Sequence, residues 1–349
     1  MAKARIALIG AGWWGVEVYV PAMIAHPDIE LVAINRRNRE ALDKILEAHN
    51  GPKGYTDYRQ MLAEEDLDAV VITSPHTLHY EHAVAALEAG CHVLIDKPMT
   101  TRAEDARKLV ALAAEKGLQI IVPYGYNYKD FATEASRLIA EGHIGEVRHV
   151  ACHMATYTFD LFSGEGLQES AGHMFQPNKS TWADPDQAGG YGWGQSSHSL
   201  GLLFRLVDLK PVEVYACDTK SPVNVDLTNA AVVTFENGAR ASVSGSALLP
   251  KHCTYQMDLR IFGTEGMVTL DMERTRLELR RFDGNDIVLD LPADAGHYEA
   301  VKPIDRLAQV CLGTCSPDDI EANGTVGLRA IEVLDAMYRS FSSGKPEKV

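Results

Sequence analysis

The chain has 349 residues, more than a single hydrophobic core usually serves, so its length predicts two domains. Its hydrophobic fraction of 46% and charged fraction of 23% are those of an ordinary globular protein. The formal net charge of −15 argues against a nucleic-acid partner, because phosphate binding needs clustered lysine and arginine.

The six cysteines are scattered, with no CxxC pair and no zinc-ligand spacing, so we expect reduced thiols and no metal site. No apolar stretch approaches the length of a membrane span, and no apolar signal region precedes the first predicted strand. We therefore expect a cytoplasmic protein without a membrane partner.

A glycine-rich turn follows the first predicted strand, residues 5–9. Its GxGxxG pattern is formed by Gly10, Gly12 and Gly15. Between a strand and a helix, these glycines allow a tight turn, close approach of the backbone to a pyrophosphate, and close helix packing. The helix amino terminus then favours the phosphates. The pattern predicts dinucleotide binding, with Trp13 and Trp14 as candidates to shield the pyrophosphate.

The second predicted strand, residues 30–35, ends in Asn35, which Arg36 and Arg37 follow. NAD-binding folds commonly place an acid here, which accepts a hydrogen bond from the ribose 2′-hydroxyl. An amide beside guanidinium groups suits a 2′-phosphate instead, since arginine can bind it bidentately. The alternative is that both arginines simply lie on a solvated helix start. The sequence favours NADP over NAD.

Helices and strands then alternate. Helical spacing covers residues 39–49, 58–64, 82–90 and 102–116, residues 51–54 are expected to form a loop, and further strands cover residues 68–73, 93–95 and 118–124. Thr73, Ser74, Pro75, His76 and His79 lie at and beyond the end of strand 68–73. This alternation predicts a doubly wound parallel sheet.

The strand 93–95 delivers Asp96, Lys97 and Pro98 at its carboxyl end. A parallel α/β sheet binds its ligands beyond the carboxyl ends of its strands, so Lys97 is expected to face the ligand. Pro98 restricts the backbone of the preceding residue. The alternative is an ordinary surface lysine in a strand-to-helix turn.

The second half begins with an amphipathic helix over residues 131–142 and a strand over residues 147–157. Residues 159–194 then form a long segment rich in Gly, Ser, Asp, Gln and Pro. Loops of this length are usually functional or disordered, so the segment is a candidate lid, with His173 and Trp182 as candidates for substrate contact.

His198 begins an apolar helix, residues 199–206, after a glycine-rich approach. A histidine on a helix is most often structural, but its position after these glycines makes His198 a candidate for catalysis or substrate contact. Trp193 and Gln195, which precede it, are further candidates for substrate contact.

Six successive strands with polar turns follow, over residues 212–217, 230–235, 240–246, 256–262, 267–270 and 277–281. The turns indicate antiparallel hairpins. A broad sheet of this kind needs its outer face covered, and a homo-oligomer (dimer or tetramer) formed through that face is the usual means. Helices over residues 303–312 and 324–341 end the chain.

Four stretches together resemble the glucose–fructose oxidoreductase and inositol dehydrogenase family (Gfo/Idh/MocA). They are Gly10–Gly12, residues 73–75 with His79, residues 96–98, and His198. The resemblance covers nearly the whole chain. It implies a Rossmann domain, residues 1–125, followed by an α/β substrate-binding domain, residues 126–349, with a large open, mainly antiparallel sheet.

The resemblance also implies that Lys97 lies beside the nicotinamide and substrate, and that His198 lies near the reacting hydroxyl. It implies a frequent cis bond before Pro98. Cofactor contacts are implied for Thr73, Ser74, Pro75, His76, His79 and Asp96. The sequence departs from the family at Gly194, where an aspartate is common.

The sequence thus predicts reversible hydride transfer between NADP(H), or NAD(H), and a secondary hydroxyl of a sugar, polyol or related small molecule. His198 is the first candidate for the base, because an imidazole titrates near neutrality. Lys97 can serve as the base only if its pKa is lowered. Otherwise it orients the hydroxyl and stabilises oxyanion charge.

Two alternatives remain open. In the first, transient oxidation of a sugar by tightly bound NAD(P) assists glycoside cleavage with no net redox change; Gly194 and the long segment keep this possibility open. In the second, the chain is a non-enzymatic sensor that binds the dinucleotide. The pair Lys97 and His198 argues against the sensor.

Overall fold

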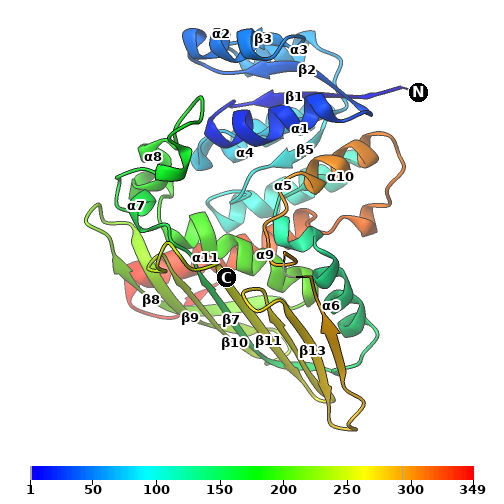
Figure 1. The fold of residues 1–349 in the computed structure, drawn as a ribbon, viewed down its shortest axis with the longest axis vertical. Coiled ribbons are helices and arrows are strands. Elements are labelled where there is room, and N and C mark those ends of the chain that lie inside the picture. Colours follow the sequence, from blue (N-terminus) through cyan, green and yellow to red (C-terminus); the bar gives the residue numbers. More distant parts are fainter. Residues whose placement is uncertain (1, 293) are drawn as a thin grey trace. The chain divides into compact units, whose positions relative to one another are not determined.

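A computed structural model describes residues 2–292 and 294–349, and it contains two compact units (Figure 1). The first comprises residues 2–123, 166–181 and 300–328. The second comprises residues 124–165, 182–299 without residue 293, and 329–349. Two segments beyond residue 125 therefore pack with the amino-terminal sheet.

A six-stranded parallel sheet forms the centre of the first unit, in the order β3-β2-β1-β4-β5-β6. Its strands are β1 (Ala4–Ile9), β2 (Ile29–Asn35), β3 (Lys53–Tyr55), β4 (Ala69–Ile72), β5 (His92–Ile95) and β6 (Ile120–Ile121). This is the strand order of the dinucleotide-binding fold, which confirms the predicted doubly wound sheet. Its apolar strands are buried on both faces, as expected for parallel strands between helices.

The helices of this unit begin and end at residues suited to those positions. The π-helix Gly15–Tyr19 leads into α1 (Val20–Ala25), and the others are α2 (Arg39–Ala48), α3 (Tyr58–Glu64), α4 (His79–Glu88), α5 (Ala103–Lys116) and α10 (Lys302–Cys311), with 3-10 turns at His76–Leu78 and Pro317–Asp319. The Asn38 side chain caps α2 by accepting from the backbone N–H of Ala41. Gly117, in a left-handed conformation, ends α5.

The second unit is built on a nine-stranded sheet in the order β14-β13-β12-β11-β7-β10-β9-β8-β15. Its strands are β7 (Val147–Ala155), β8 (Pro211–Lys220), β9 (Asp226–Phe235), β10 (Arg240–Ser246), β11 (Gln256–Gly263), β12 (Gly266–Asp271), β13 (Arg276–Arg281), β14 (Ile287–Asp290) and β15 (Glu347–Lys348). The pair β7 and β10 is parallel and the other pairs are antiparallel, which confirms the predicted large, mainly antiparallel sheet.

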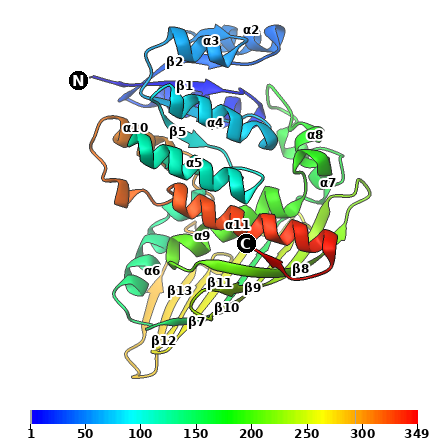
Figure 2. The same cartoon turned by 180° about the vertical axis from the view of Figure 1, so that it is seen from behind.

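Helices cover one face of this sheet (Figures 1 and 2). They are α6 (Asp130–Ala140), α9 (Ser197–Leu206) and α11 (Gly324–Ser343), which starts in the first unit. The shorter helical turns of this unit are Gly125–Tyr128, α7 (Phe159–Phe162), Pro185–Gln187 and the π-helix Gly192–Ser196, whereas Gln168–Ser170 and most of α8 (Lys179–Trp182) belong to the first unit. Alternate residues of β9 such as Val233 are buried, whereas Val232 is 51% exposed on the open face.

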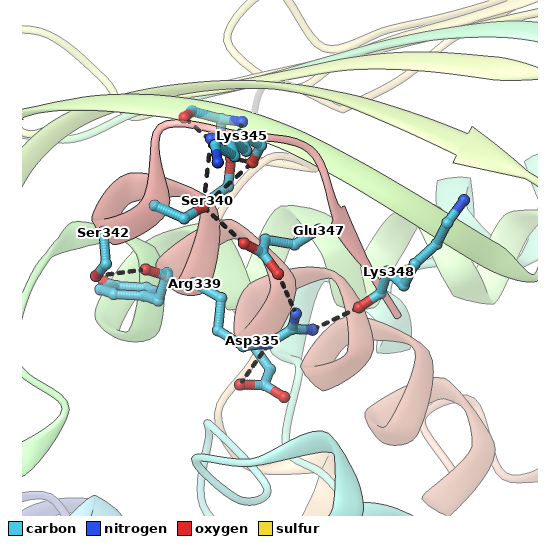
Figure 3. Close-up of polar contacts among 10 residues, drawn as sticks. Asp335, Arg339, Ser340, Ser342, Lys345, Glu347 and Lys348 are labelled. Atoms are coloured by element: carbon cyan, nitrogen blue, oxygen red, sulfur yellow. Dashed lines mark hydrogen bonds and ion pairs between the residues drawn. The ribbon is translucent and has the colours of Figure 1, made fainter.

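The carboxyl-terminal strand β15 adds to the edge of this sheet by pairing with β8. Arg339 donates to the Glu347 carboxylate at 2.9 Å and to the Lys348 carbonyl oxygen at 2.7 Å (Figure 3). The Ser340 hydroxyl donates to the Lys345 carbonyl oxygen at 2.7 Å. These bonds tie the end of α11 to the strand that follows it.

Several elements differ from expectation. Residues 53–55 form β3 rather than a loop, because Gly54 packs against α2 and the segment pairs with the edge of β2. Helix α4 begins at His79, three residues earlier than expected, directly after a 3-10 turn. The sheet contains two further strands, β14 and β15, beyond the six successive strands predicted. Their apolar patterns are too short to be identified in the sequence. Of the helices within the described ranges, none has both the length and the apolar character needed to cross a bilayer.

Candidate active site

The three glycines of the glycine-rich turn are needed for different reasons: Gly10 and Gly15 for the fold, and Gly12 for the ligand. Gly10 has a φ of +76°, and a Cβ there would lie 2.6 Å from the Ser74 Cα. A Cβ at Gly15 would overlap the Thr73 side chain. At Gly12, however, a Cβ would meet only carbonyl oxygens at 3.6 Å, an ordinary contact. The fold tolerates a side chain at Gly12, so the space there fits the close approach of a dinucleotide pyrophosphate.

This difference gives a first prediction. Gly12→Ala should leave the free energy of unfolding within about 0.5 kcal/mol of the unmodified protein. It should weaken NADPH binding by about tenfold or more, because the added methyl group occupies the place of the pyrophosphate. Thermal melting and isothermal titration check the two parts; unchanged affinity would mean that the phosphates bind elsewhere.

Asn35 ties the same turn to the neighbouring strands. Its carbonyl oxygen accepts from the backbone N–H of Ala11 at 3.0 Å, and its buried side-chain amide donates to the Tyr55 carbonyl oxygen at 3.1 Å. Arg36 is half-buried and donates to the Ala11 carbonyl oxygen, and burial lowers its pKa. Arg37 is exposed. Of these three residues, Arg36 is the one whose charged group lies at the turn.

His79 joins the ends of two neighbouring strands. Its Nε2 lies 2.7 Å from the carbonyl oxygen of Ser74, beyond β4, and its Nδ1 lies 2.7 Å from that of Pro98, beyond β5. Burial lowers the pKa of His79, and a neutral imidazole donates to only one of these oxygens. The residue is 1% exposed, so the geometry makes it a link between the strand ends. Its direct contact with cofactor stays a prediction.

His82 belongs to the same cluster and was missed in the sequence. Its Nδ1 lies 2.9 Å from the Ser74 hydroxyl, and its ring packs edge-on against Tyr58 at 4.4 Å. Burial lowers its pKa to about 4, so it is neutral at pH 7. The ring of His76, also buried, lies 5.9 Å from that of His79. The spacing of His79 and His82, three residues apart on one helix, was the available signal.

Lys97 follows β5, and the bond between it and Pro98 is cis, as expected. The Asp96 carboxylate accepts from the backbone N–H of Lys97 at 2.9 Å. Burial lowers the pKa of Lys97 to about 8, against the opposing effect of the Asp96 charge. Burial also raises the pKa of Asp96. Lys97 therefore meets the condition for a base: part of it is a neutral amine near pH 7 to 8.

In the second unit, His198 lies in the first turn of α9, 6% exposed. Three tyrosine rings meet its imidazole edge-on, with centroids 5.2 Å away for Tyr298, 6.2 Å for Tyr126 and 6.3 Å for Tyr124. The rings fix the orientation of the imidazole and keep water from most of its surface. Nothing in the spacing of Tyr298, a hundred residues downstream, connects it to His198.

The structure explains why residue 194 is glycine. A Cβ there would lie 2.8 Å from Phe162 Cζ and 3.2 Å from Trp182 Cζ3. Both rings are held by the segment between β7 and α9, and they leave no room for the aspartate that is common in the family. The position four residues before His198 is therefore surrounded by aromatic rings and carries no carboxylate.

Asp226 holds the backbone that leads to His198. It accepts from the Gly192 backbone N–H at 2.9 Å and from the Tyr338 hydroxyl at 2.6 Å. Trp193 stacks on the Tyr338 ring at 4.8 Å and is 5% exposed, so little of its surface remains for a ligand. Gln195 is partly exposed. The contacts of Trp193 and Gln195 with substrate stay predictions.

Lys97 belongs to the first unit and His198 to the second. Across residues 2–292 and 294–349, no group of three or more His, Cys, Asp or Glu side chains is arranged to hold a metal ion.

Two family models match the chain. Residues 4–124 match the model described as "Oxidoreductase family, NAD-binding Rossmann fold", and residues 132–269 match the GFO/IDH/MocA C-terminal domain. Together they cover most of the sequence, and each match falls on one of the two sheets described above.

Several relatives are named for reactions on sugars. The chain is 27% identical to dTDP-3,4-didehydro-2,6-dideoxy-alpha-D-glucose 3-reductase of Streptomyces antibioticus, over 86% of this chain and 87% of the relative. It is 26% identical to D-xylose 1-dehydrogenase (NADP(+)) 2 of Haloferax volcanii, over 97% of both chains. The WlbA dehydrogenase of Bordetella pertussis, solved with NADH and UDP-GlcNAcA, shares the fold with a TM-score of 0.75, at 24% identity over 99% of both chains.

Proposed function

Because the chain belongs to the GFO/IDH/MocA family of oxidoreductases, we propose that it transfers a hydride between NADP(H) and a secondary hydroxyl of a sugar or related polyol. The observation that carries the proposal is the position of Lys97, directly after Asp96 at the carboxyl end of strand β5 in the parallel sheet of an NAD-binding fold, where burial lowers its pKa to about 8. Relatives named for sugar reduction and D-xylose oxidation support the substrate class.

In oxidation, the substrate C–H bond gives its electron pair as a hydride and the hydroxyl gives a proton. The nicotinamide, when bound, supplies the hydride acceptor. The neutral amine of Lys97 takes the proton, and the imidazole of His198 donates a hydrogen bond to the substrate oxygen as negative charge develops there. His198, favoured as the base from sequence, becomes the oxyanion donor in this proposal because the pKa of Lys97 is lowered.

The cofactor preference rests on Arg36, and Arg36→Ala tests it. The variant should bind NADPH about 10- to 100-fold more weakly, the loss expected for a charge-assisted hydrogen bond to the 2′-phosphate. NADH affinity should change by less than about threefold, because NADH has no phosphate at this position. Arg37→Ala, which removes the exposed neighbour, is the matched control. Equal losses for both nucleotides would show that Arg36 does not read the 2′-phosphate.

We also propose that a second copy of this chain covers the open face of the nine-stranded sheet. Tyr215 and Val232 lie opposite one another on β8 and β9 and are 47% and 51% exposed. Association of two such faces removes this apolar surface from water, and the same patch on each copy makes a closed dimer possible.

A panel of sugars and polyols tests the activity. With the purified protein and NADP⁺, net formation of NADPH at 340 nm on at least one sugar supports the proposal. Release of an aglycone without net NADPH would instead support the glycoside-cleaving alternative, which has no support among the relatives described above. Tight NADP(H) binding without turnover of any member would support the sensor, against the oxidoreductase family assignment.

A further inference from the structure

The segment Gly166–Thr181 packs with the dinucleotide-binding sheet although it lies far from that sheet in sequence. The residues on either side of it, up to 165 and from 182, belong to the second unit. Within the segment, the buried Ser170 bonds with the exposed Gln176: the Ser170 hydroxyl donates to the Gln176 side-chain oxygen, and the Gln176 amide donates to the Ser170 carbonyl oxygen. The segment therefore has a defined local fold, and we call Gly166–Thr181 the strap.

Two hydrogen bonds fix the strap to the glycine-rich turn and to the π-helix that follows it. The indole N–H of Trp13 donates to His173 Nδ1 at 2.7 Å, and the two rings stack with centroids 6.1 Å apart. The backbone N–H of Met174 donates to the Glu17 carboxylate at 2.7 Å. Trp13 follows Gly12 directly, so the strap meets the turn at the place where a dinucleotide pyrophosphate lies in this fold.

A third contact joins the strap to the ribose end of the same site. The guanidinium carbon of Arg36 lies 3.9 Å from the ring centroid of Phe175, a cation–π geometry. Arg36 also donates to the Ala11 carbonyl oxygen within the turn. The ring and this bond together fix the plane of the guanidinium beside the turn, where the adenosine ribose of a dinucleotide is bound.

We propose that the strap completes the cofactor site: His173 holds it over the pyrophosphate turn, Phe175 orients Arg36 toward the 2′-phosphate, and the bound cofactor leaves only when the strap opens. This inference rests on the proposed function. It assigns cofactor-site roles to two residues outside the Rossmann half of the sequence, where sequence reasoning expected a substrate lid.

Release of NADPH and NADH measures the strap directly, without turnover. Energy transfer from tryptophan to the bound reduced nucleotide reports binding, and a chase with excess oxidised nucleotide gives the release rate. His173→Ala should raise the release rate of both nucleotides about tenfold, the loss expected for one hydrogen bond. His173→Asn, which keeps an acceptor at the position of Nδ1, should stay within about twofold. Glu169→Gln, an exposed change within the strap, is the matched control.

Two further variants separate the contacts. Trp13→Phe removes the same hydrogen bond from the side of the turn and keeps an aromatic ring, so the test does not depend on one variant folding. The double variant Trp13→Phe with His173→Ala should release the nucleotides no faster than either single variant, because both changes remove the same hydrogen bond. Phe175→Ala should speed the release of NADPH more than that of NADH, because Arg36 loses the cation–π contact that orients it.

The outcomes distinguish the strap from the function on which it rests. Unchanged release rates in His173→Ala and Phe175→Ala, with normal nucleotide binding, would overturn the strap alone. Additive effects of Trp13→Phe and His173→Ala would show that the hydrogen bond does not hold the strap. Failure of the unmodified protein to bind either nucleotide would overturn the proposed function together with the strap.

Discussion

Lys97→Ala will lower kcat for sugar oxidation by about 10³-fold, within the range lost when a positioned acid or base is removed. The Kd for NADPH should change by less than about threefold, because the methylene chain and amine of Lys97 are assigned to the hydroxyl rather than to the phosphates. Stopped-flow measurement of NADPH formation and a fluorescence titration give the two values separately.

The pH dependence of the unmodified protein identifies the form of Lys97 that acts. Burial lowers its pKa to about 8, so the neutral amine is the minor form at pH 6 and the major form at pH 10. For a base, kcat/KM should rise about tenfold per pH unit below pH 8 and level off above it. The positive charge of the bound oxidised nicotinamide lowers the pKa of Lys97 further. With cofactor bound, the rise in the profile therefore moves to lower pH.

Two variants control for Lys97→Ala. Lys97→Arg keeps a cation but has no neutral form at these pH values, so it should be as inactive as the alanine variant. Lys108→Ala removes an exposed lysine of the same unit, paired with Glu104, and should leave kcat unchanged. Near-normal turnover by Lys97→Ala would remove Lys97 from the mechanism.

His198→Ala is expected to lower kcat by about 10²-fold, because alanine offers no hydrogen-bond donor to the developing oxyanion. The rise of kcat/KM with pH should survive in this variant, because Lys97 still accepts the proton. NADPH affinity should be unchanged. The pH–rate profile of the purified variant is the measurement that separates the two residues.

His143, which is partly exposed, provides the control for this second variant. His143→Ala makes the same chemical change in the same unit, away from the tyrosine rings, and should retain full activity. If His198→Ala instead abolishes the rise with pH while Lys97 is intact, His198 is the base and the roles assigned to the two residues are reversed.

Much of the first unit could be predicted because its signals are local. The apolar run before Gly10 and the glycine spacing mark a strand, a turn and a helix start within a few residues. β3 was missed for the opposite reason: Lys53–Tyr55 is a strand only because β2 offers it an edge. Lys97 was predicted as a site residue from its place after an apolar strand, but its lowered pKa depends on burial, which the sequence does not reveal.

The surroundings of His198 could be predicted only in part. The glycine-rich approach singled out the histidine, and Gly194 was recognised as a departure from the family. The reason for that glycine, the rings of Phe162 and Trp182, lies in contacts across the fold. Tyr298 comes from still farther along the chain. The long segment was singled out as a candidate lid from its length and composition, but its contact with Trp13 required the structure.

The central claim is that an amine from the first unit and an imidazole from the second act on one substrate carbon. A crystal structure of the protein with NADP⁺ and a polyol it oxidises, trapped in Lys97→Arg to prevent turnover, tests it most directly. The account predicts density for one hydroxyl oxygen within hydrogen-bond distance of both residue 97 and the His198 ring, beside the nicotinamide. A polyol bound to only one of these residues, with the other facing a separate cleft, would contradict it.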